Sequence, residues 1–209
     1  TLSYGNHSDT AADQSKDLRY GTTPTDDPLH PNKLNDAANK ITTYYFRTTF
    51  YVTAQQLSAA QAIYLNLRRD DGAVVYLNGK EVLRQNLPEG QITALTFGNL
   101  AAGGNEEALY FRYPLNKADL VAGTNTLAVE IHQASLTSSD IILAAAVDAI
   151  IPSDVTTLVP RASTWKYLDD GSNQGTAWTG AAFNDAAWRS GAGSFGYNDS
   201  TSNASGTSA

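Results

Sequence analysis

Alternation of apolar and polar side chains is the main regular pattern in the chain after residue 40. Within residues 41–52, the side chains of Tyr44, Phe46, Phe50 and Val52 fall on one face of an extended chain. Successive side chains of a strand point to opposite faces of its sheet, so this period of two predicts a half-buried strand. The same alternation recurs in three later segments, residues 63–68, 109–113 and 126–133.

The clearest local signal is the run RRDDGAVVYLNGKEVL, residues 68–83. Residues 73–77 are β-branched or aromatic, which suits a pleated, half-buried surface. Asn78 and Gly79 supply the two residues with positive φ that a type I′ hairpin turn requires. Residues 80–83 then form the returning strand. The run therefore predicts a strand, a tight turn and a second strand.

The order of these segments predicts the fold class and the domain organisation. Residues 141–151 form a continuous apolar run, which is typical of a central strand. The strands are separated by short turn-rich loops, and no long helical pattern is present, so we expect an all-β chain folded as an antiparallel β-sandwich or jelly roll. The pattern divides the chain into three parts. Residues 1–150 form the main sandwich, with a long N-terminal loop at 1–40. Residues 151–156 form a linker, and residues 157–209 form a further group of strands.

Composition narrows the classes of partner. The 209 residues carry a net charge of −7, which argues against nucleic acid and against anionic membranes, because both call for a basic face. No apolar run is long enough to span a bilayer, and no signal-peptide pattern opens the sequence, so we expect a mature chain or a fragment without a membrane span. Cys and Met are absent, which is compatible with an oxidising extracellular setting.

Three runs resemble a known family. They are DDGAVVYLNGKEV, TNTLAVEIHQ and STWKYLDDGSNQGTAW…FNDAAWRSGAGSFGY. Together they are similar to the galactose-binding-domain-like β-sandwich modules that accompany secreted bacterial phosphoesterases, glycosidases and surface proteins. The resemblance covers most of the chain outside residues 5–40. It implies a galactose-binding-like sandwich and a bacterial protein that is secreted or lies on the cell surface.

The order of these runs departs from the family's pattern. The aromatic run opens the family's domain, but here it occupies residues 164–197, after the closing strands. Tyr4 resembles Tyr197, which predicts an internal repeat that begins inside one unit and stops inside the next. Residues 157–195 would then either fold back onto their own sandwich or complete a neighbouring copy by strand donation. The aromatic residues assigned to this assembly are Trp165, Tyr167, Trp178, Phe183, Trp188, Phe195 and Tyr197.

Carboxylates mark two candidate cation sites. Asp70 and Asp71 precede Gly72, and this grouping is typical of a turn, with ligation of Ca²⁺ as the alternative. The acidic residues among the first 40 are interpreted as a solvated loop or, alternatively, as a metal site.

A second group of side chains is a candidate for ligand contact. Glu130 and His132 share the non-core face of a predicted strand, as a solvent-facing pair, a hydrogen-bonded histidine in a groove, or a metal or acid–base pair. Tyr45, Tyr64 and Tyr110 alternate away from the predicted core faces. Exposed tyrosines of this kind can stack on sugar rings, and the alternative is packing within the protein.

No phosphate-binding loop, nucleophile elbow or zinc-binding helix motif is present, so we expect no catalytic activity. Our first hypothesis is an extracellular structural module. It would be a repeat of a surface protein or a filament subunit that binds copies of itself, or neighbouring repeats, head to tail by strand complementation. The alternative hypothesis is a carbohydrate-binding accessory module of a secreted hydrolase, with a polysaccharide as its partner.

Overall fold

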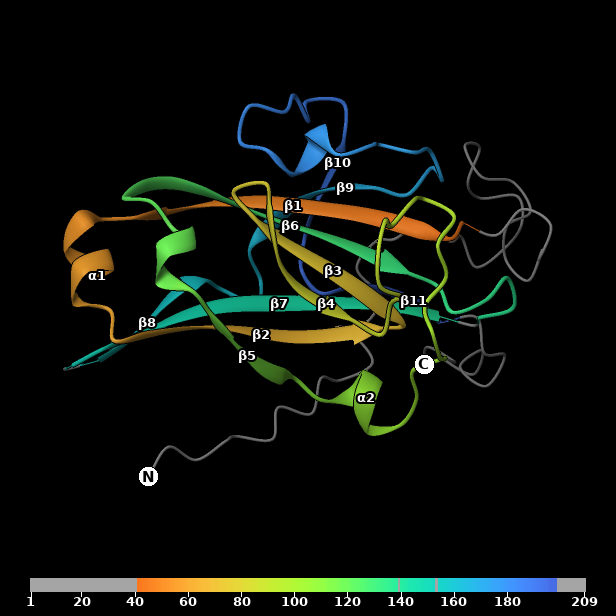
Figure 1. Ribbon diagram of the computed structural model, residues 1–209, viewed down its shortest axis with the longest axis horizontal. Helices are drawn as coiled ribbons and strands as arrows, with labels where there is room; N and C mark the ends of the chain where they lie inside the picture. Colours follow the sequence, from red (N-terminus) through yellow and green to blue (C-terminus); the bar gives the residue numbers. More distant parts are fainter. Residues whose placement is uncertain (1–40, 139, 153, 199–209) are drawn as a thin grey trace, which may run out of the picture.

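The computed structural model describes residues 41–138, 140–152 and 154–198, which form two antiparallel sheets packed face to face (Figure 1). This confirms the predicted all-β sandwich. The acidic loop of residues 1–40 and the comparison of Tyr4 with Tyr197 rest on residues outside the described part of the chain. No helix in that part is long and apolar enough to cross a membrane.

The first sheet has six strands. In spatial order they are β10 (Arg189–Ala192), β9 (Thr164–Leu168), β1 (Thr43–Val52), β6 (Gly123–His132), β3 (Gly72–Leu77) and β4 (Lys80–Gln85). The long pairing of β1 with β6 joins Thr43 to His132 at one end and Val52 to Gly123 at the other. Residues near the start of the chain therefore lie beside residues from its middle.

The second sheet has the order β11 (Phe195–Asn198), β7 (Asp140–Ile151), β2 (Ala62–Asp70) and β5 (Phe111–Leu115). A further strand, β8 (Asp154–Val159), pairs with the last residues of β7, while β11 pairs with the first ones. The short helices α1 (Ala54–Ala59), α2 (Asn105–Ala108), η2 (Lys117–Asp119) and η3 (Ala177–Thr179) lie in the connections.

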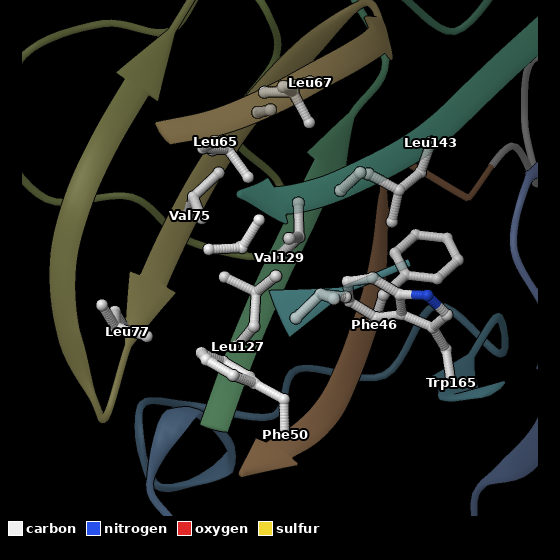
Figure 2. Packing of buried hydrophobic residues seen from close by; sticks show 14 of the residues in the cluster. Phe46, Phe50, Leu65, Leu67, Val75, Leu77, Leu127, Val129, Leu143 and Trp165 are labelled. Carbon is white, nitrogen blue, oxygen red and sulfur yellow. The ribbon is translucent and has the colours of Figure 1, made fainter. Parts of the chain in front are cut away.

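The alternating side chains make the core, as their period of two requires. Phe46 and Phe50 of β1 and Leu65 and Leu67 of β2 belong to one buried cluster (Figure 2). Burying one such side chain contributes about 1.5–3 kcal/mol, so this shared core is what holds the sheets together.

The predicted hairpin is confirmed. Asn78 and Gly79 have φ angles of 54° and 84°, as a type I′ turn demands. The Asn78 side chain also accepts a hydrogen bond from the backbone N–H of Thr126 at 2.9 Å and donates to Asn125 Oδ1 at 2.9 Å. The turn is therefore tied to the neighbouring strand β6 as well as closed on itself.

One local prediction differs from the structure. Residues 151–156, expected as a linker, instead contain the last residue of β7 and the start of β8. The apolar end of β7 pairs with β8, so both ends of the expected linker belong to the second sheet. Residues 92–97 form a loop, in which Thr93 and Thr96 hydrogen-bond across a turn.

The C-terminal strands belong to both sheets of this chain. β9 pairs with β1 in the first sheet, and β11 pairs with β7 in the second. Trp165, Tyr167 and Phe195 are buried in the main core, where Phe195 lies 5.2 Å from the ring of Phe46. The strands that complete the two sheets are thus supplied by residues 164–198.

Candidate functional site

The outer face of the six-stranded sheet carries an aromatic cluster under residues 176–188, which we call the strap. The Tyr45 ring lies 4.9 Å from that of Trp178 and 6.5 Å from that of Trp188, with Phe183 packed beside them. Tyr45 was expected to point outward for external contact. It does face away from the main core, but the strap covers it and leaves it 2% exposed, so that prediction is wrong.

Arg47 holds the strap to the sheet. Its guanidinium donates to Asp185 Oδ2 at 2.5 Å, to the Phe183 carbonyl at 3.2 Å and to the Gly180 carbonyl at 2.9 Å. Arg47 is buried, and the cation also lies 5.4 Å from the centre of the Phe183 ring. A buried guanidinium needs hydrogen-bond and ionic partners to replace water, and the strap supplies them.

Glu130 and His132 lie beside this cluster, and both are buried rather than solvent-facing as one interpretation had it. Glu130 Oε1 accepts a 2.6 Å hydrogen bond from the Tyr76 hydroxyl, and Glu130 Oε2 lies 3.4 Å from His132 Nε2. His132 Nδ1 lies 2.7 Å from the Thr96 carbonyl, which can only accept. Nδ1 therefore carries a proton and donates it, which agrees with the interpretation as a hydrogen-bonded histidine.

Two tyrosines of this face are held in their neutral form. Burial and the nearby Glu130 carboxylate raise the pKa of Tyr45 to about 12. The same two causes raise the pKa of Tyr76 further. Both effects penalise a phenolate, so neither hydroxyl can serve as a base near neutral pH.

Asp70 ends β2 and Asp71 connects it to β3, so the two residues lie at a change of strand, as the turn interpretation predicts. Both are buried; Asp70 pairs with Ile142 as the last residue of β2. The Asp71 carboxylate accepts hydrogen bonds from the N–H groups of Ala102 and Ala134 and from Ser138 Oγ, at 2.6–2.7 Å. It therefore joins the loops of residues 86–104 and 133–138. Within the described residues, no three His, Asp or Glu side chains gather as a cation site.

Tyr64 and Tyr110 are not open stacking platforms. The guanidinium of Arg112 lies 3.8 Å from the centre of the Tyr64 ring, and that of Arg161 lies 3.8 Å from the centre of the Tyr110 ring. A sugar could reach either covered face only by displacing a cation held over the ring.

Four other residues meet where β2 and β5 reach the loops. These are Arg69, Glu106, Phe111 and Tyr113, which we call the β5 corner. Phe111 pairs with Leu67, two residues before Arg69 on the same face of β2, and α2 carries Glu106 alongside the end of that strand (Figure 1). The Phe111 side chain is 38% exposed, and Tyr113 is half-buried.

Charges converge at the β5 corner. The Arg69 guanidinium is buried and donates from Nη1 to the Asp71 carbonyl, while its Nη2 lies 4.0 Å from Glu106 Oε2. Burial raises the pKa of the Tyr113 hydroxyl; Arg69 lowers it and Glu106 raises it, so both charges act on this phenol. Sequence patterning missed the corner, because an arginine at an inward position of a strand gives no motif. Its one signal was a charge that interrupts the apolar alternation of β2.

The loops near the β5 corner also expose apolar side chains. Large hydrophobic residues there are open to solvent, namely Leu95, Phe97, Leu100, Leu109, Phe111 and Leu136. Apolar surface concentrated on loops at one end of a sandwich is typical of a binding end.

No family model matches the chain, and no curated protein matches it. Solved structures do. An α-L-rhamnosidase of Streptomyces avermitilis complexed with L-rhamnose is 19% identical, with a TM-score of 0.53 over 72% of this chain and 12% of that one. An α-L-rhamnosidase of Dictyoglomus thermophilum is 13% identical, with a TM-score of 0.48. The match covers 76% of this chain and 18% of that one. A Pleurotus ostreatus lectin in complex with GalNAc is 18% identical, with a TM-score of 0.43. The match covers 75% of this chain and 38% of that one.

The likeness to the Streptomyces enzyme establishes the fold. This chain spans about an eighth of that protein's length, so the similarity concerns one domain of a much larger molecule. Together with the two antiparallel sheets, it shows that the chain has an antiparallel β-sandwich fold.

Proposed function

We propose that this chain is a non-catalytic carbohydrate-binding module whose contact surface is the β5 corner. The observation that carries the proposal is the buried Arg69 guanidinium, whose charge acts on the half-buried Tyr113, on the same face of the second sheet as the partly exposed Phe111. A sugar ring presents both apolar C–H faces and hydroxyl groups. It is recognised by an aromatic surface combined with a few fixed polar groups.

The structural neighbour supports this proposal. It is described as a rhamnosidase complexed with L-rhamnose, and the part that resembles this chain is a small share of it. A domain of that size suits an accessory module attached to a larger, secreted carbohydrate-active protein. The galactose-binding-like family resemblance of the sequence agrees with the same role.

We place no catalytic step in this domain. The groups best suited to acid–base chemistry are Glu130 and His132, and both are already engaged by neighbouring residues. Tyr76 donates a hydrogen bond to Glu130 Oε1, and Thr43 Oγ1 and the Thr96 carbonyl lie within hydrogen-bond distance of His132 Nδ1. A catalytic acid or base must reach the proton that it transfers, so these groups are better suited to holding the sheet and the 93–98 loop together.

One observation favours the structural module as a second candidate. β9, β10 and β11 complete both sheets, yet they follow the strands that close the family's domain. The same strands supplied to a neighbouring copy would produce a head-to-tail filament, because such a contact is heterologous.

The binding proposal is tested with a glycan array and calorimetry on the purified domain, with and without Ca²⁺. We expect Phe111→Ala to weaken saccharide binding by about tenfold, because stacked aromatic surface contributes on the order of 1 kcal/mol or more. The matched control is Tyr51→Ala, which removes another exposed aromatic ring from β1. Absence of binding to every saccharide, or equal losses in both variants, would contradict the proposal.

A further inference from the structure

We propose that the β5 corner selects acidic saccharides, and that the carboxylate of a uronic acid replaces Glu106 as the partner of Arg69. This inference rests on the proposed function and names its ligand class. The net charge of the chain, −7, would by itself repel an anionic ligand. Binding of an acidic saccharide therefore requires a local cation.

The first step is the state of Arg69. The residue is 7% exposed, and Nη1 donates to the Asp71 carbonyl. Its Nε is buried and has no hydrogen-bond acceptor among the described residues, and the same is true of Arg47 Nε. A guanidinium has five donors in a planar fork, so a buried one with an unused donor is short of partners.

The second step is the weakness of its ion pair. Glu106 Oε2 lies 4.0 Å from Arg69 Nη2, which is too far for a hydrogen bond. The Glu106 side chain is 56% exposed, so water solvates it well. By contrast, Arg47 holds Asp185 at 2.5 Å with a side chain buried to a similar degree. Arg69 therefore lacks the close carboxylate that a buried cation of this chain has elsewhere.

The third step is the fit of the ligand. A carboxylate is planar and takes two parallel hydrogen bonds from an arginine fork, which neither a hydroxyl nor an ammonium group can do. The pyranose ring that bears it would lie over the partly exposed Phe111 and beside the Tyr113 hydroxyl. Glu106 belongs to the four-residue helix α2, and its side chain is exposed, so the ligand carboxylate can displace it from Arg69.

The experiment compares oligogalacturonate with the matching neutral galactose oligomer by calorimetry. We expect the acidic oligomer to bind about tenfold more tightly, as charge-assisted bidentate bonds predict, and added salt to reduce that preference. Glu106→Gln removes the competing carboxylate, so it should tighten oligogalacturonate binding several-fold and leave the neutral oligomer unchanged. Glu89→Gln is the matched control, since it removes an equal charge from an exposed residue of the 86–104 loop.

The outcomes separate this inference from the function on which it rests. Equal binding of neutral and acidic oligomers overturns the inference while the carbohydrate-binding function stands. So does an equal effect of the two glutamate variants, which would indicate bulk charge alone. Binding of neither oligomer, together with an empty glycan array, overturns both. Arg69→Lys keeps the charge but loses the fork; a drop in acidic preference in this folded variant supports the bidentate contact.

Discussion

Arg47 Nη1 and Asp185 Oδ2 are 2.5 Å apart, although 138 residues separate them in the sequence. Arg47 belongs to the first strand of the sandwich, and Asp185 lies in the strap near the end of the described chain. Two carbonyls of the strap accept from the same guanidinium. This pair therefore fixes the late aromatic segment over the early strand, and with it the burial of Tyr45 and Trp178.

Asp185→Ala should detach the strap from the sheet. The buried guanidinium would lose its carboxylate, and hydrogen bonds to charged groups contribute about 1.5–3 kcal/mol. We expect the free energy of unfolding, measured in urea, to fall by that amount and tryptophan fluorescence to shift as Trp178 and Trp188 become solvated.

The control for Asp185→Ala is Asp119→Ala. It removes an ion pair of similar length, 2.6 Å, whose partner Lys80 is 63% exposed. Exposed pairs contribute about 0–1 kcal/mol. Equal losses of stability in the two variants would show that Arg47 does not anchor the strap.

Stability should fall at alkaline pH because of Tyr45. Its pKa is about 12 in the folded chain and about 10 when unfolded. The unfolded state therefore releases the phenol proton first, so this contribution to stability is complete below pH 10 and is lost as the pH rises to about 12. Tyr45→Phe should flatten that fall in a series of denaturation curves. Tyr51→Phe, at an exposed position, should leave it unchanged, and an identical slope in all three proteins would contradict the assignment.

Asp71→Asn should loosen the loops that flank the β5 corner. An amide cannot accept from all three of the donors that the carboxylate satisfies, and we expect a loss of about 1.5–3 kcal/mol. Faster hydrogen exchange at the amides of Ala102 and Ala134 would identify the loops affected. The control Asp170→Asn changes an exposed turn carboxylate and should cost less than about 0.5 kcal/mol. Unchanged exchange at both amides would exclude the role given to Asp71.

A chain that ends after residue 159 should not fold cooperatively. It lacks β9, β10 and β11, and with them the buried rings of Trp165, Tyr167 and Phe195. Three buried aromatic side chains contribute about 1.5–3 kcal/mol each, which is comparable to the whole stability of a typical domain. Thermal melting and sedimentation would measure the loss. A peptide of residues 160–198 that restores folding when added separately would favour strand complementation, whereas a truncated monomer with an unchanged melting curve would exclude any need for these strands.

The sequence alone determined the local structure wherever one pattern dominated. Alternation in β1, β2 and β6 predicted both the strands and the side chains that form the core, because a strand's two faces follow from its covalent geometry. Asn78 and Gly79 predicted the hairpin, because few other residues tolerate both of its φ angles. The aromatic run marked the strands that complete the sheets, although it did not state which sandwich they complete.

Only the tertiary structure decided which polar and aromatic side chains remain accessible. Tyr45 alternates away from the core as the pattern says, but the strap, distant in sequence, covers it. Tyr64 and Tyr110 are covered by arginines, from the paired strand β5 and from beyond β8, and Asp71 gathers donors from two separate loops. Arg69 became a candidate because the second sheet brings it beside Phe111 and Glu106. Periodicity fixes the face on which a side chain lies, whereas its solvent exposure depends on segments that pack there from elsewhere in the chain.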